Sequence, residues 1–238
     1  MRYKKGQVTI FIIIAIIIIV LVVLFFVLRG SLKKEKVSGP EINSLKNYIQ
    51  ECLDEQLEYG VIFIGLQGGY DTLPENHLIT EFSSIAYGYN KRNTLITLSE
   101  MEDQMSYYIG EVLPLCVDET VFPDLTIETR NPRVKTVIER RDVLVEIDYR
   151  IIITKGDSVS EIRDFKSKVS VRLGDMHNAA KQIIEELSSN YIDLTYLSGL
   201  DYTVNILPQD NNVFIYSIID EETKLNEVPY VFNFAVRK

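Results

Sequence analysis

The sequence predicts an α+β protein, in which an N-terminal transmembrane helix precedes an exported body of amphipathic helices and antiparallel sheet. Three observations predict this class. An uncharged run of 21 residues, Val8–Leu28, contains 20 hydrophobic residues. Apolar residues then recur at helical spacing through the first half of the body, and short alternating segments separated by turn residues fill the second half.

The chain divides into five predicted parts. They are a basic leader (1–6), a transmembrane helix (7–29), a linker (30–40), a helix-rich part of the body (41–125) and a part with an antiparallel sheet and one helix (126–238). Whether the last two parts form one domain or two is left open by the sequence.

The apolar run has the length of a membrane span. At 1.5 Å per residue a helix over Val8–Leu28 is about 31 Å long, close to the thickness of the hydrocarbon core. The run is too long for a secretory signal, and the residues after it, 29–33, offer no small-x-small cleavage site. We therefore expect the lipid bilayer to be the partner of this segment, with the chain in the cell membrane as a single-pass protein.

Charge is distributed unevenly along the chain. The formal net charge is −9, yet residues 1–29 contain four basic residues and no acidic one. The remainder has 25 − 4 = 21 basic against 34 acidic residues, or −13. A body this acidic repels nucleic acid, so we expect no nucleic-acid partner. The basic residues on the two sides of the run nearly balance and do not fix its orientation.

The first half of the body is predicted to form two helices with a strand pair between them. A helix opens at Gly39-Pro40, is buried over Val61–Leu66 and ends at Gly68-Gly69. Residues 78–98 indicate a hairpin or two short strands. Ser99 and Glu102 form a capping box that starts a second helix at Glu100, which Pro114 ends.

The second half is predicted to form β-hairpins on both sides of one helix. The predicted strands are 134–139, 143–154, a long strand over 158–172 with a bulge or bend, 202–207, 213–219 and 230–236, and the predicted helix is 175–188. The two strands 202–207 and 213–219 meet across Asp210-Asn211-Asn212. Successive hairpins favour an antiparallel sheet over a nucleotide-binding βαβ fold.

Two cysteines, Cys52 and Cys116, are the candidates for a covalent link. An exported body favours a disulfide, which would close a loop of roughly 65 residues and contribute about 4 kcal/mol on the chain-entropy model. The alternative is a pair of buried free thiols, the state expected in a reducing compartment.

Other chemistry has little support in the sequence. His77 and His177 belong to no HExxH, CxxC or paired-histidine motif, and no phosphate-binding or nucleophile motif is present. We therefore expect no metal, no cofactor and no catalytic residues. An anchored enzyme would require folding to gather one of the histidines with a cysteine or carboxylates in one cleft.

The junction between leader and apolar run carries a family resemblance. Lys4-Lys5-Gly6-Gln7-Val8-Thr9, followed at once by the run, resembles the class III signal peptide of archaeal type IV prepilins. The resemblance covers residues 4–28. It implies that a membrane prepilin peptidase cuts between Gly6 and Gln7, that the apolar stretch stays on the mature protein, and that the body lies outside the cell.

Two positions depart from the family pattern. The family often has Glu at the fifth mature position, where this chain has Phe11, and the long pilin helix is interrupted here by Gly30 and then Gly39-Pro40. Both departures argue against a major filament subunit. We expect a membrane-anchored pilin-like surface or assembly protein that acts by association, with the peptidase and copies of itself as partners. The alternative is an anchored extracellular ligand-binding or sensory domain.

Overall fold

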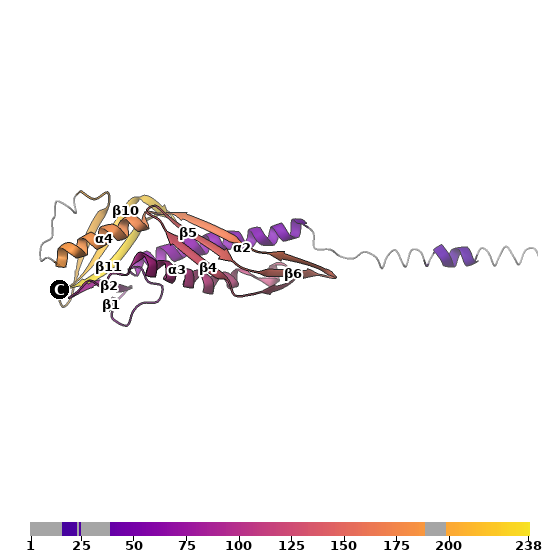
Figure 1. Ribbon diagram of the computed structural model, residues 1–238, viewed down its shortest axis with the longest axis horizontal. Helices are drawn as coiled ribbons and strands as arrows, with labels where there is room; N and C mark the ends of the chain where they lie inside the picture. The colour runs from indigo at the N-terminus through magenta and orange to yellow at the C-terminus, as the bar shows by residue number, and fades with distance from the viewer. Residues whose placement is uncertain (1–15, 23, 25–38, 189–198) are drawn as a thin grey trace, which may run out of the picture.

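The computed structural model describes residues 16–22, 24, 39–188 and 199–238 (Figure 1). Residues 16–22 and 24, the described part of the predicted transmembrane helix, are helical with exposed side chains. Within the described ranges no helix is both long enough and apolar enough to cross a membrane. The predicted fold class is wrong in this respect. The rest of 7–29, the leader 1–6 and most of the linker 30–40 lie outside the described residues.

The longest helix of the described body, α2 (Gly39–Leu66), runs along its length (Figure 1). Its 28 residues would be long enough to span a bilayer, but charged side chains interrupt its apolar pattern. Leu45, Ile49, Leu53 and Leu57 recur every fourth residue and are fully buried. This periodicity gives α2 one buried face, as the sequence predicted for the helix after Gly39-Pro40.

The end of α2 is a glycine cap. Gly68 and Gly69 have φ values of 77° and 97°, a region that side chains other than glycine adopt at a cost. The N–H of Gly69 donates to the carbonyl oxygen of Ile64 at 2.8 Å, five residues back, as in a Schellman cap. The predicted helix end is confirmed.

The second helix, α3 (Leu98–Val112), starts two residues earlier than predicted. Its capping box pairs Thr97 with Glu100, rather than Ser99 with Glu102. Glu102 is engaged elsewhere, because its carboxylate accepts the backbone N–H of Ile138 at 2.8 Å. Local spacing alone offers both boxes, and the contact of α3 with the sheet favours the earlier one.

Two short 3-10 helices, η1 (Leu113–Cys116) and η2 (Glu119–Val121), follow α3, and the next α-helix of the body is α4 (Leu173–Ser188). The strands are β1 (His77–Ile79), β2 (Ser84–Asn90), β3 (Thr126–Thr129), β4 (Arg133–Ile138), β5 (Asp142–Asp148), β6 (Ile151–Lys155), β7 (Ser158–Ile162), β8 (Phe165–Ser170), β9 (Thr203–Gln209), β10 (Val213–Leu225) and β11 (Val228–Arg237).

The strands form three sheets. Their orders are β1-β2-β11-β10-β9, β3-β6-β7 and β4-β5-β8. Neighbouring strands are antiparallel except β2 and β11, which run parallel with Tyr87 beside Ala235. The parallel pair joins β11 of the part predicted as an antiparallel sheet to β2 of the part predicted as helix-rich, a link that the sequence did not predict. Hairpin signals could not show this pairing, because the two strands are far apart in the sequence.

Two long predicted strands are each divided. The segment 143–154 becomes β5 and β6, and 158–172 becomes β7 and β8, so one predicted sheet separates into two. The two breaks lie next to each other, because Arg163, between β7 and β8, contacts Asp148 at the end of β5. There Asp164 has a φ of 59°, and Asp148 accepts a hydrogen bond from Arg163 at 2.8 Å. Hydrogen bonds from Arg163 and then Arg133 hold the pKa of Asp148 well below its usual value.

The final strands form two tight hairpins. Asn211 and Asn212, with φ values of 59° and 57°, join β9 to β10 as predicted. Asn226 and Glu227, with φ values of 48° and 66°, make a second such turn, and β10 continues through the predicted end at residue 219 to reach it. The sequence signal for this second turn is weak, because Glu is an unusual residue at positive φ.

One large hydrophobic core joins the helix-rich and sheet-rich parts, next to a smaller cluster that includes Ile85 and Ala235. One cluster of buried residues extends from Leu45 in α2 to Val236 in β11 and includes residues of α3 and α4. The parallel pairing of β2 with β11 also crosses the predicted boundary at residues 125 and 126. The two parts are therefore interleaved in one fold.

Candidate functional site

The two cysteines are joined. Cys52 of α2 and Cys116 of η1 form a disulfide, with their Cα atoms 5.9 Å apart and a sequence separation of 64. Pro114 shapes the turn that brings Cys116 back onto α2. The bond links α2 to the segment that follows α3, and the alternative of two free thiols does not apply.

The two histidines lie in different settings. Nδ1 of His77 is 2.7 Å from the carbonyl oxygen of Pro74 in a half-buried loop. His177 is buried, and its Nε2 lies 2.7 Å from the carbonyl oxygen of Ile96, the geometry of an N–H donor. Burial lowers the pKa of His177, and nearby Lys181 lowers it further. The ring is accordingly held neutral in the core.

Among the described residues, neither histidine belongs to a cluster of side chains that could hold a metal ion. Among the residues that the structure describes, no three His, Cys, Asp or Glu side chains are placed to hold a metal ion. The predicted processing site, Gly6 and Gln7, lies outside the described residues.

An apolar groove lies between the C-terminal half of α2 and the hairpin of β10 and β11. Its volume is about 340 Å³. The apolar groove is lined by three residues of α2 and six of the hairpin: Tyr59, Ile62, Leu66, Leu225, Asn226, Val228, Pro229, Tyr230 and Val231. Val228 is 61% exposed and Leu66 42% exposed. Large apolar side chains that remain open to water around a concavity are typical of binding surfaces.

The floor of the apolar groove depends on a close approach of α2 to β11. Gly65 carries no side chain, and a Cβ atom placed there would lie 2.5 Å from the carbonyl oxygen of Val231 and 2.7 Å from the hydroxyl of Tyr230. The hydroxyl of Tyr230 donates to the carbonyl oxygen of Val61 at 3.1 Å. Burial raises the pKa of Tyr230 far above its ordinary value, so the hydroxyl keeps its proton.

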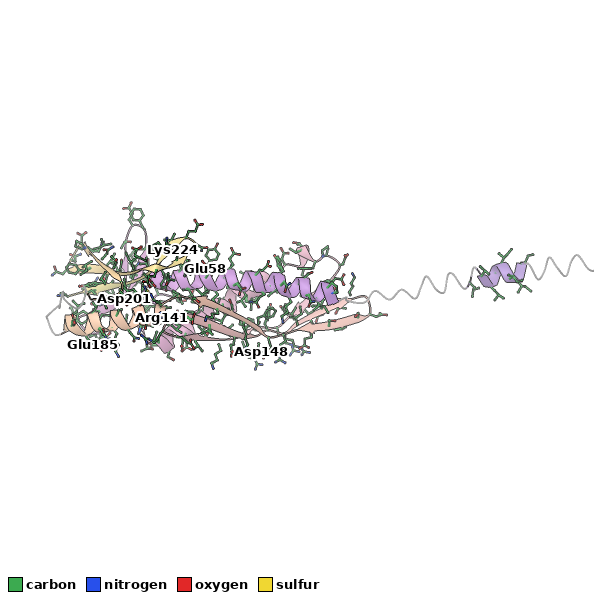
Figure 2. All side chains as sticks on the ribbon, turned by 90° about the horizontal axis from the view of Figure 1, so that it is seen from above. Glu58, Arg141, Asp148, Glu185, Asp201 and Lys224 are labelled. Carbon is green, nitrogen blue, oxygen red and sulfur yellow. A yellow bond between two sulfur atoms is a disulfide. The ribbon has the colours of Figure 1, made fainter. Side chains whose placement is uncertain are left out.

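One rim of the apolar groove is polar. The backbone N–H of Asn226, in the turn between β10 and β11, donates to the carboxylate of Glu58 at 2.8 Å. Figure 2 labels Glu58 of α2 and Lys224 of β10. Lys224 is the strand partner of Pro229, a groove residue, and its side chain is exposed. The rim therefore offers an ammonium group next to an apolar surface.

Sequence reasoning missed the apolar groove. It assigned Val61–Leu66 to the buried interior, whereas Phe63 is 44% exposed next to the exposed Leu66. The signal was present in the spacing. Tyr59, Phe63 and Leu66 follow a second helical stripe at i, i+4 and i+7, displaced from the stripe that is buried in the core. A helix that is apolar on two faces has one more surface to cover than the fold uses.

A second hollow, of about 540 Å³, lies beside α4 and is lined by polar residues. Two of its charged residues, Arg140 and Asp175, pair with each other. The Nε atom of Arg140 donates to Asp175 at 2.7 Å, and Arg141 lies 3.9 Å from the other oxygen of the same carboxylate. Because Arg140 and Asp175 already pair with each other, a charged ligand would gain less here than an apolar partner would gain at the apolar groove.

Comparison with protein-family models, with curated proteins and with solved structures found no match.

Proposed function

We propose that this protein is a pilin-like surface or assembly protein that acts by association with other proteins rather than by catalysis. The observation that carries the proposal is the apolar groove. Its side chains stand open to water in a body that otherwise buries a continuous core. Burying such a surface against a partner contributes about 25 cal/mol per Å² of apolar area, so association is the favourable use of it.

Two further features support the proposal. The disulfide between Cys52 and Cys116 fits a protein that folds in an oxidising compartment, because cytosolic thiols are kept reduced. The residues around Gly6 and Gln7 resemble a prepilin leader, a type of signal that directs a protein out of the cell. The proposed location of the body is therefore extracytoplasmic.

Site-directed photo-cross-linking in the producing cells tests the role of the apolar groove. Tyr59 is replaced by p-benzoylphenylalanine, which keeps an aromatic ring at the groove and reacts with neighbouring C–H bonds. The matched control places the same residue at Tyr107, an exposed tyrosine of α3. We expect protein adducts from position 59 and few from position 107. Equal, background-level adducts at both positions would contradict an associative role for the groove.

The export of the body is tested separately. N-terminal sequencing of the mature protein should begin at Gln7, and mass mapping without reductant should recover Cys52 and Cys116 in one linked peptide pair. A mature chain that starts at Met1 would refute processing after Gly6. Two alkylatable thiols in the protein from cells would refute the oxidising location.

A further inference from the structure

The turn between β1 and β2 presents Phe82, the most exposed large apolar side chain of the described body. Phe82 is 90% exposed and Ile79, three residues earlier, is 73% exposed. Isolated exposed apolar residues are common on protein surfaces, but two within four residues at a hairpin tip form a protrusion. Phe82 has no role in the core, so its presence in the turn is not explained by folding.

The turn is held in one conformation by Thr80. The N–H of Thr80 donates to the carbonyl oxygen of Ser83 at 2.8 Å. The hydroxyl of Thr80 donates to the same carbonyl oxygen at 2.9 Å, and accepts the N–H groups of Ser83 at 3.0 Å and Phe82 at 3.3 Å. A turn that is already ordered loses little conformational entropy on binding, which favours its use as an anchor.

The exposed apolar side chains of the β1–β2 turn match the apolar groove in chemical character and in size. An aromatic ring can bury about 150–250 Å² when it enters an apolar pocket, and a groove of about 340 Å³ has room for one ring and part of its neighbour. Their charges also match. Glu81 lies next to Phe82, and the exposed Lys224 is the strand partner of Pro229 at the groove. The carboxylate of Glu58 at the same rim already accepts the N–H of Asn226.

We propose that the apolar groove of one copy receives the β1–β2 turn of a second copy, with Phe82 inserted in the groove and Glu81 next to Lys224. This inference rests on the proposed associative function and names its partner. The turn and the groove are different patches, so the contact is heterologous, and each copy offers one of each. Such contacts build rings where the rotation closes and extended filaments where it does not.

The test adds substitutions to the cross-linking strain that carries p-benzoylphenylalanine at position 59. We expect adducts of twice the chain mass, containing two differently tagged copies when both are co-expressed. Phe82→Ser should lower the yield of this adduct about tenfold or more, the loss expected when one buried aromatic anchor is removed. Val159→Ser, at an exposed apolar residue of β7, is the matched control and should leave the yield unchanged.

A charge exchange tests the register of the contact. Glu81→Lys and Lys224→Glu should each lower the adduct yield, and the two substitutions together should restore it, because they recreate an opposite pair. Phe82 and Glu81 are exposed, so these variants should unfold at the wild-type urea concentration, which checks that loss of adduct is not loss of folding.

The outcomes separate this inference from the function on which it rests. Adducts from position 59 to a different protein would overturn the self-association and keep the associative function. A self-adduct that persists in Phe82→Ser would also overturn the proposed contact. The absence of any adduct from position 59 would overturn both.

Discussion

Gly65 shows how one missing side chain positions the apolar groove. A Cβ atom at residue 65 would meet the backbone of β11 at 2.5 Å, a contact that requires α2 or β11 to move. We expect Gly65→Ala to lower the free energy of unfolding by about 1–3 kcal/mol, the usual cost of forcing atoms into a packed interior. Urea unfolding of the full chain measures this change.

Gly110 provides the matched control in α3. The nearest heavy atom to a Cβ placed at residue 110 is a methyl carbon of Val134 at 4.0 Å, so an alanine fits without displacement. Gly110→Ala should leave stability unchanged or raise it by up to about 1 kcal/mol, since alanine favours the helix. A loss of stability of similar size in both variants would show that the close approach of α2 to β11 is not the cause.

His177 makes the stability of the fold depend on pH. Burial lowers its pKa in the folded chain, while in the unfolded chain the pKa is near the ordinary value of about 6.5. Below that pH the unfolded chain therefore binds more protons than the folded chain. The stability contributed by neutral His177 is fully present above about pH 6.5, and decreases as the pH falls toward the folded pKa. The slope is at most about 1.4 kcal/mol per pH unit.

His177→Gln is the variant that isolates this titration. The glutamine amide can still donate to the carbonyl oxygen of Ile96 but carries no titratable proton. Urea unfolding between pH 5 and 7 should show a loss of stability in the wild type that is smaller in the variant. Parallel curves for the two proteins would contradict a neutral, buried His177.

At the scale of elements, a buried ion pair fixes the start of α4 to the five-stranded sheet, through β10. Arg172, just before α4, donates from Nε to Asp220 of β10 at 2.7 Å, and Asp220 is fully buried. Burial raises the pKa of Asp220, but hydrogen bonds from Arg172 and from the backbone of Glu222 and Thr223 outweigh it and leave this pKa below its ordinary value. Asp220→Ala should therefore cost about 3–5 kcal/mol, because the buried guanidinium group keeps only the exposed Glu222, at 3.2 Å, as an acidic partner.

An exposed ion pair provides the comparison for Asp220→Ala. Lys166 and Glu146 lie 2.7 Å apart on the surface of β8 and β5, with both side chains mostly open to water. Glu146→Ala should leave the urea midpoint almost unchanged, because solvent screens such pairs. Equal effects of the two substitutions would show that burial does not determine the cost of losing the acid.

Features set by interactions between neighbouring residues were predicted from the sequence, whereas features set by contacts between distant residues were not. The glycine cap at Gly68 and the turn at Asn211 and Asn212 are set by local backbone conformation, and both were predicted. The parallel pairing of β2 with β11 depends on residues far apart in the chain, and it was not. The capping box of α3 lies between these cases, because two local solutions exist and a tertiary contact decides between them.

The candidate site was the least predictable part of the molecule. The disulfide was one of two alternatives, since cysteine content does not reveal whether Cys52 and Cys116 meet in space. The apolar groove has no motif, because it arises where a helix face and a distant hairpin approach each other around Gly65. Periodicity shows that the end of α2 is apolar on two sides, but not which side the fold covers.

At the scale of the whole molecule, the interleaved core predicts one cooperative unfolding transition. Buried residues of α2 and α3 pack in the same cluster as those of α4, β10 and β11, so neither 41–125 nor 126–238 has a core of its own. Hydrogen exchange measured by mass spectrometry at increasing urea should give peptides from both parts the same midpoint for global opening. Gly65→Ala, at the contact of α2 with β11, should lower both midpoints equally. Two separate midpoints, or a shift confined to one part, would show two units that unfold independently.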